Sequence, residues 1–175
     1  MLTVMTAMQA ASLAWIETRR PLFGVLIAER RFKELDMLFF RMSKIAVVLL
    51  TVGVTLFTAG VEVASRLPYW FFERISERVP ETSSVLIYGV GLIVMQLAQC
   101  TNLYVRAHKR DPFMLAAIIS NLLIAVFVFV LGRSYGIPGV AIGYAVGVSV
   151  VQTPLWVGIW YRTRRAWHQE MSANV

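Results

Sequence analysis

The feature that most constrains this chain is a series of long apolar runs that carry no charge and are separated by short basic connections. Residues 85–105 and 113–131 contain no charged side chain, and the turn between them carries Arg106, Lys109 and Arg110. Each run is long enough to cross a bilayer as a helix, which takes roughly 20 residues. The sequence therefore predicts an integral membrane protein built from helices.

Composition supports this class. Apolar residues make up 58% of the chain, charged residues 15%, and the mean hydropathy is +0.65. A soluble domain carries about a quarter charged residues. The net charge of +7 does not indicate nucleic-acid binding, because the basic residues are dispersed between apolar runs. Cys100 is the only cysteine, and His108 and His168 are far apart, so neither a metal nor another cofactor is predicted.

The pattern extends along the whole chain and predicts a single all-α membrane domain over residues 1–175, with about five transmembrane helices. We expect these spans at residues 1–28, 45–64, 85–105, 113–131 and 139–161, with a tail at 162–175. The first run is apolar, but it is interrupted by Glu17, Arg19, Arg20 and Pro21.

The distribution of basic residues predicts the orientation of such a bundle. With five spans, the connections at 29–44 and 106–111 share one side with the tail. Those segments carry Arg30, Arg31, Lys33, Arg41, Lys44, Arg106, Lys109, Arg110, Arg162, Arg164 and Arg165. The opposite side receives only Arg66, Arg74, Arg78 and Arg133. Because cytoplasmic loops collect Lys and Arg, the C-terminus is predicted to be cytoplasmic.

Residues 29–44 also show an amphipathic pattern. Phe32, Leu35, Phe39 and Met42 recur at helical spacing among charged neighbours. This segment is therefore expected to form a helix that lies along the cytoplasmic interface.

Arg19 and Arg20 are the most costly residues in the apolar runs, since an Arg at a helix centre costs about 2.5–3.5 kcal/mol. Two interpretations remain open. The preceding run ends near Ile16 and places both side chains at the lipid headgroups, or the helix continues to Ala28, kinked at Pro21. In the second case both guanidiniums face a water-filled cavity and suit a diphosphate, whose oxygens match the planar fork of Arg.

A polar stripe marks the third span, where Gln96, Gln99 and Asn102 recur every three residues. Asn121 and Gln152 add single amides to the next two spans. Such side chains form hydrogen bonds between helices, typically worth about 0.6 kcal/mol each. The alternative is a hydrated lumen in which Gln96, Gln99 and Asn121 contact the hydroxyl groups of a sugar.

Small residues mark the start of the last span. Gly139, Gly143 and Gly147 recur every four residues. This spacing lets a neighbouring helix approach closely, so the ridge is expected to serve packing.

Three stretches resemble the C-terminal part of the polysaccharide and O-antigen flippases, which belong to the multidrug/oligosaccharidyl-lipid/polysaccharide (MOP) superfamily. They are residues 15–28 (WIETRRPLFGVLIA, continuing into 32–41), 106–113 (RAHKRDPF) and 135–143 (YGIPGVAIG). The resemblance implies the last five of twelve helices, in the inner membrane of a bacterium. It also implies transport of undecaprenyl-diphosphate-linked sugars across that membrane, with Arg19 and Arg20 as the cationic residues that bind them.

The resemblance also implies a partner, because an N-terminal helical bundle is missing from these residues and one bundle cannot form a two-sided cavity. Two other functions stay open. One is a short accessory or truncated membrane protein that does not transport alone. The other is a membrane polymerase or glycosyl transferase, which is less favoured because only Glu73, Glu77, Glu81 and Arg78 could supply its acid–base chemistry.

Overall fold

A computed structural model describes residues 2–66, 81–107 and 113–172 of the chain. Within these residues every regular element is a helix and no strand occurs, which confirms the predicted all-α fold. The elements are α1 (Leu2–Glu17), α2 (Arg20–Ala28), α3 (Phe32–Ser65), α5 (Thr82–Ala107), α6 (Phe113–Val146), the π-helical stretch η1 (Gly147–Gln152) and α7 (Thr153–Ser172).

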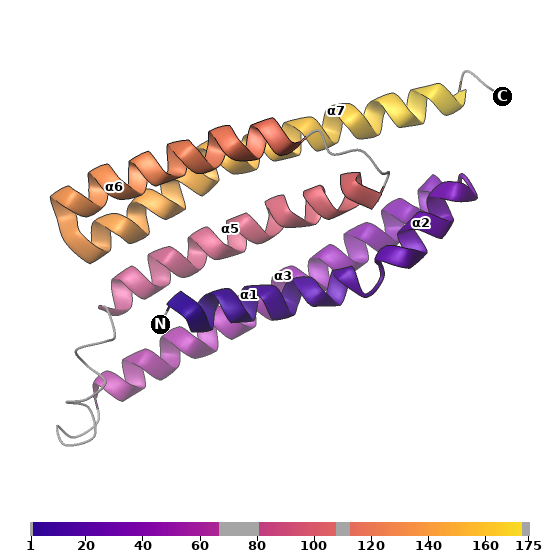
Figure 1. Cartoon of the computed structure of the whole chain (residues 1–175). Coiled ribbons are helices and arrows are strands. Elements are labelled where there is room, and N and C mark those ends of the chain that lie inside the picture. The colour runs from indigo at the N-terminus through magenta and orange to yellow at the C-terminus, as the bar shows by residue number, and fades with distance from the viewer. Residues whose placement is uncertain (1, 67–80, 108–112, 173–175) are drawn as a thin grey trace.

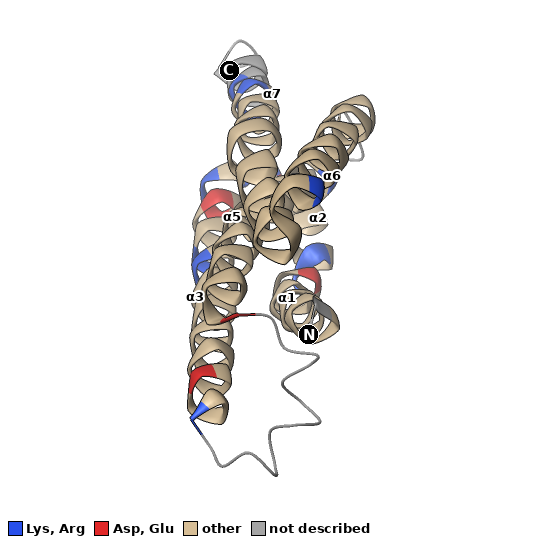
Figure 2. Cartoon of the chain, turned by 90° about the vertical axis from the view of Figure 1, so that its left-hand side faces the viewer, with Lys and Arg blue, Asp and Glu red and all other residues tan. Residues whose placement is uncertain are grey.

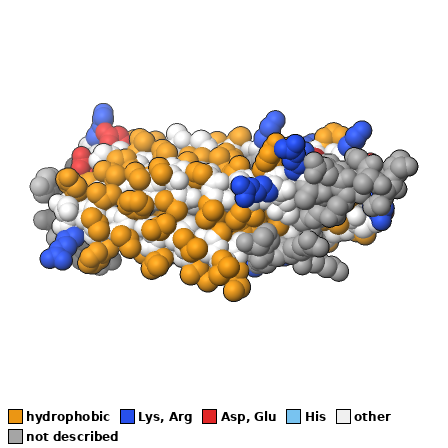
Figure 3. Space-filling view, turned by 90° about the horizontal axis from the view of Figure 1, so that it is seen from above, with side chains coloured by type: hydrophobic (Ala, Val, Ile, Leu, Met, Phe, Trp, Pro, Cys, Tyr) orange, Lys and Arg blue, Asp and Glu red, His pale blue; other side chains and the backbone are white. Residues whose placement is uncertain are grey.

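Three helical stretches of the described chain are long and apolar enough to cross a membrane. They are Phe32–Ser65, Thr82–Ala107 and Phe113–Arg165, whose most apolar 18-residue segments have mean hydropathies of 2.0, 1.6 and 2.8. Charged side chains lie mainly toward the two ends of the molecule, and apolar side chains cover the face between them (Figure 3). This distribution matches a protein inserted in a bilayer.

α5 forms the centre of the bundle. It lies between a layer of α1 and α3 and a layer of α6 and α7 (Figure 1, and Figure 2 from the side), and it contacts all four helices. Half of the most apolar 18-residue segment of α5 is buried inside the protein, whereas only 17% of the corresponding segment of Phe32–Ser65 is buried. The outer helices therefore present most of their apolar surface away from the protein, as lipid-facing helices do.

The first run of the sequence is divided into two helices. α1 ends at Glu17 and α2 begins at Arg20, with Pro21 in its first turn. Because the ring of a proline clashes with the carbonyl four residues earlier, Pro21 prevents a continuous helix through Glu17. The predicted kink is therefore a break, and it lies just before the proline.

The predicted interfacial helix at residues 29–44 is wrong as a separate element. The residues from Phe32 onward continue without interruption into the second apolar run as one helix, α3, of 34 residues and about 51 Å. The buried positions explain this continuity. Leu35, Phe39 and Met42 lie on the same helix face as Ala46, Leu50 and Val54, so one packing stripe runs through both segments.

A reversal inside α6 pairs the last two apolar runs. Gly136 has φ 64° and ψ −140°, a left-handed conformation that favours glycine, and Pro138 follows it. The chain turns back there and runs alongside its own preceding segment (Figure 1). A Cβ atom at Gly143 would lie 2.7 Å from the Phe127 carbonyl oxygen, and one at Gly139 would collide with the Leu131 carbonyl. The predicted role of the glycine ridge in close packing is confirmed.

Candidate functional site

A polar cluster joins three helices at the end of the molecule where α5 ends and α7 continues (Figure 1). The Tyr104 hydroxyl of α5 donates a hydrogen bond of 2.8 Å to Oδ1 of Asp36 in α3. Arg164 of α7 donates to the other carboxylate oxygen, with Nη2 at 2.5 Å and Nε at 3.2 Å. The Asp36 side chain is 14% exposed and that of Arg164 is 30% exposed, so water screens this ion pair only in part.

Aromatic rings surround the Arg164 guanidinium. Its central carbon lies 5.4 Å from the centroid of the Trp160 ring and 5.8 Å from that of Phe40, within the range of cation–π attraction. The hydrogen bonds to Asp36 raise the pKa of Arg164, which lies beyond the last apolar run. The cluster therefore holds a fixed positive charge against three packed helices.

The chemistry available to this cluster is structural. Asp36 supplies the only carboxylate in it, and its oxygens are already engaged by Tyr104 and Arg164. Among the described residues, no group of three or more His, Cys, Asp or Glu side chains could hold a metal ion. The arrangement joins the start of α3 and the end of α5 to the middle of α7.

The sequence predicted Arg164 only as a cytoplasmic anchor, and it did not predict Asp36 as a site residue. The signal for Asp36 was its position on the amphipathic segment: an acidic residue next to Leu35, on the edge of the buried face. Of the other anchors, Arg106, Arg162 and Arg165 are exposed. Lys109 and Arg110 lie outside the described residues.

Arg19 and Arg20 lie at the break between α1 and α2. Both side chains are exposed, and neither forms an ion pair or a side-chain hydrogen bond within the described chain. Glu17 is also exposed and does not pair with them. α2 begins at this point, so the positive end of its dipole lies beside two guanidiniums. The break therefore concentrates positive charge at one position along an apolar helix pair.

The predicted amides do not form one site with these arginines. Gln96 is fully buried, Gln99 is half-buried and Asn121 is exposed on α6. Gln152 is 1% exposed, and no group of the described residues hydrogen-bonds to either amide atom of Gln96 or Gln152. The predicted hydrogen bonds between helices are therefore not formed by these two side chains.

Gln96 and Gln152 lie at a similar level of the bundle. α5 and the η1–α7 stretch run in the same direction. Gly91 lies close to Tyr144, and further along both segments the rings of Tyr104 and Trp160 lie 6.1 Å apart. Both glutamines fall between these contacts. Gln152 belongs to the π-helical stretch η1, a conformation often found at functional sites.

The acidic residues considered for an enzyme are mostly outside this description. Glu81 is exposed at the start of the α5 segment. Glu73, Glu77 and Arg78 lie outside the described residues.

The fold thus defines an all-helical protein with helices able to span a membrane. No protein-family model, no curated protein and no solved structure matches this chain.

Proposed function

We propose that the chain acts as the C-terminal helical bundle of a flippase for lipid-linked polysaccharide precursors in a bacterial inner membrane. The reaction is transport without covalent chemistry. A diphosphate-linked oligosaccharide on a polyprenyl carrier is moved from the cytoplasmic to the outer leaflet. The resemblance of three sequence stretches to such flippases gives the class of substrate.

The observation that carries the proposal is the break at Arg19 and Arg20. In membrane transporters, interrupted helices place the N-terminal end of a half-helix against the anionic group of the substrate. Here the N-terminal end of α2 adds its dipole to two exposed guanidiniums that have no acidic partner among the described residues. Arg binds phosphate oxygens through paired donors, so this position suits a diphosphate.

The arrangement of helices is compatible with five passes. α1 with α2 makes the first, α3 the second and α5 the third, and the reversal at Gly136 divides the last long stretch into two. The basic segments at 29–44 and 106–111 then share the cytoplasmic side with the tail. In this topology the break at Arg19 lies in the cytoplasmic part of the first pass, on the side from which the substrate is taken.

A second bundle completes the transporter in this proposal. Alternating access needs two bundles that move against each other around the binding site. The exposure of Arg19 and Arg20 on one side of the first helix pair leaves them accessible to such a bundle. It is supplied either by a further segment of the same protein or by another chain.

The test compares arginine variants in cells that depend on this protein for surface polysaccharide. Arg19→Ala and Arg20→Ala should each abolish surface polysaccharide, while the protein level in the membrane stays unchanged and complete lipid-linked units accumulate. The Arg19→Lys/Arg20→Lys double variant keeps the charge without the planar fork and should restore part of the activity. Arg133→Ala, an exposed arginine at the opposite end, is the matched control.

The outcomes separate the alternatives. Surface polysaccharide at the normal level in both alanine variants contradicts the proposal and favours an accessory protein without transport of its own. Loss of surface polysaccharide without complete lipid-linked units favours a polymerase or glycosyl transferase.

A further inference from the structure

We infer that a groove between α3, α5 and α7 binds one anionic glycerophospholipid, such as phosphatidylglycerol, with an acyl chain in the groove and the phosphate on basic residues of α3. This site is distinct from the break at Arg19, and its existence does not depend on transport.

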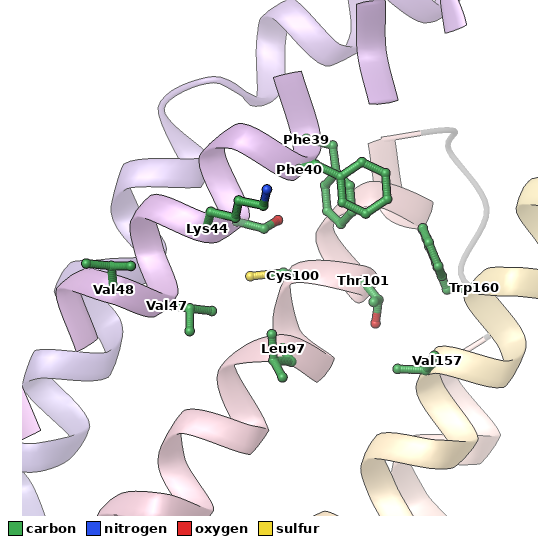
Figure 4. A pocket seen from close by; sticks show the side chains of 11 residues that line it. Phe39, Phe40, Lys44, Val47, Val48, Leu97, Cys100, Thr101, Val157 and Trp160 are labelled. Atoms are coloured by element: carbon green, nitrogen blue, oxygen red, sulfur yellow. The ribbon is translucent and has the colours of Figure 1, made fainter. Parts of the chain in front are cut away.

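The apolar part of the site is a groove of about 490 Å³. Figure 4 shows its walls, which come from three helices: Phe39, Phe40, Ser43, Lys44, Val47, Val48, Leu97, Cys100, Thr101, Val157 and Trp160. Its volume is within the range of ligand sites, about 300–1,000 Å³. Phe40, Val48 and Leu97 are 42%, 59% and 44% exposed, so the groove opens on the outer surface of the bundle, where lipid chains lie.

The polar part is an adjoining hollow along the same face of α3. It is lined by Lys33, Asp36, Met37, Phe40, Arg41 and Lys44, and it shares Phe40 and Lys44 with the groove. Lys33, Arg41 and Lys44 are all exposed. None of the three forms an ion pair within the described chain. Asp36 does not neutralise them, because its carboxylate is engaged by Arg164.

The combination of the two parts selects the ligand. An apolar groove alone accepts any acyl chain, and a basic patch alone accepts any phosphate. Here three cations, which have no acidic partner in the part of the chain that the structure describes, continue directly from the open groove through Lys44. A basic hollow on helices at the cytoplasmic interface is a recurrent binding site for anionic lipid headgroups. A glycerophospholipid with a net negative headgroup satisfies both parts with one molecule.

Arg164 supports the aromatic wall of the groove. Its guanidinium stacks near Phe40 and Trp160, which both line the groove. The Asp36–Arg164 pair thereby holds the aromatic wall in place next to the cations. The positive group of a zwitterionic lipid would lie next to these cations, so such a lipid would be disfavoured.

Quenching of Trp160 tests the site in the purified chain reconstituted in nanodiscs. Brominated acyl chains quench nearby indoles, and the difference between the protein and its Trp160→Phe variant isolates the signal of Trp160. Brominated phosphatidylglycerol should quench this signal more than brominated phosphatidylcholine at equal mole fraction. Lys44→Gln and Arg41→Gln should each lower the preference about fivefold, since one cation near the surface contributes about 1 kcal/mol.

The controls use the same measurement. Arg133→Gln removes an exposed cation from the opposite end and should leave the preference unchanged. Lys33→Gln provides a third, independent variant if one of the others fails to fold, and far-ultraviolet circular dichroism checks the helix content of each.

Three outcomes would overturn the inference. Equal quenching by both lipids, unaffected by the variants, means that the groove faces lipid without headgroup selectivity. Absence of quenching by either lipid means that protein, such as a second copy of this chain, covers the groove. Loss of the preference on adding inorganic phosphate at the same concentration as the lipid means that free phosphate is the ligand.

Discussion

Arg164 and Asp36 form an ion pair across 128 positions of the sequence, with Nη2 of the guanidinium 2.5 Å from Oδ2 of the carboxylate. The pair joins the start of α3 to the middle of α7, and the Tyr104 hydroxyl adds α5 to it. Most surface ion pairs in proteins contribute little, but this pair is mostly shielded and its carboxylate is satisfied by three hydrogen bonds.

Breaking this pair should destabilise the fold more than breaking a surface pair. Asp36→Asn is expected to lower the free energy of unfolding by about 1.5–3 kcal/mol, because the charged hydrogen bonds of Arg164 are lost. Arg31→Gln is the matched control: its ion pairs with Glu29 and Glu34 are about half exposed and screened by water, so their loss should cost clearly less. Chemical unfolding in detergent measures both. Equal effects would contradict a structural role of the cluster.

Tyr104→Phe tests the third member of the cluster. The substitution removes the hydroxyl that donates to Asp36 but keeps the ring, which packs edge-on against Phe39 with centroids 4.9 Å apart. The expected loss is about 0.5–1.5 kcal/mol, that of one hydrogen bond. In the background of Asp36→Asn the loss should be smaller, and full additivity in unfolding measurements would show that the two residues do not interact.

The ion pair should be insensitive to alkaline pH. The hydrogen bonds to Asp36 raise the pKa of Arg164 above the ordinary value of an arginine. A group whose pKa is raised by folding contributes its full stabilisation below its unfolded pKa and loses it only as pH rises through the folded value. The destabilisation caused by Arg164→Gln should therefore be the same at pH 7 and pH 10. A smaller effect at pH 10 would contradict the assignment.

Glycine-to-alanine substitutions should separate close packing from helix propensity. At Gly143 a Cβ would lie 2.7 Å from the Phe127 carbonyl oxygen, so Gly143→Ala must push the two arms of the hairpin apart, at a cost of about 1–3 kcal/mol. At Gly158 a Cβ meets nothing within 4 Å, so Gly158→Ala should be neutral or stabilise by up to about 1 kcal/mol. Thermal unfolding in detergent measures both, and a neutral Gly143→Ala would contradict the close approach.

Substitution of the buried amides should distinguish packing from a polar function. Gln96 and Gln152 are buried without hydrogen-bond partners in the protein, so near-isosteric Gln96→Met and Gln152→Met are expected to stabilise the fold by about 1–3 kcal/mol. If the amides serve transport, the same variants lose surface polysaccharide despite their greater stability. Destabilised variants would mean that the amides are satisfied in the membrane.

Local patterns in the sequence were sufficient for the helices but not for all of their boundaries. Long uncharged runs and the Gly139 ridge depend on spacing along one segment, so they were readable directly. The extent of α3 was not, because the amphipathic spacing at 29–44 is compatible both with a surface helix and with the continuation of a buried stripe. Which of the two structures forms depends on the apolar surfaces of α1, α2 and α5 against which this segment packs.

The site was harder to predict, for a physical reason. Arg19 and Arg20 stand out because an isolated charge in an apolar run is costly at any position. Asp36 and Arg164 look like ordinary solvated charges until the tertiary fold brings them together. Nothing local to either residue indicates a partner 128 positions away.

The reversal at Gly136 has a consequence for the order in which the molecule assembles. The two arms that it joins are neighbours in sequence, so their pairing closes only a short loop and costs little chain entropy. The Asp36–Arg164 contact, in contrast, closes a loop of 128 positions. We therefore expect the hairpin to insert into the bilayer as a preformed unit. The contact between Arg164 of α7 and Asp36 should then form as the last step of folding.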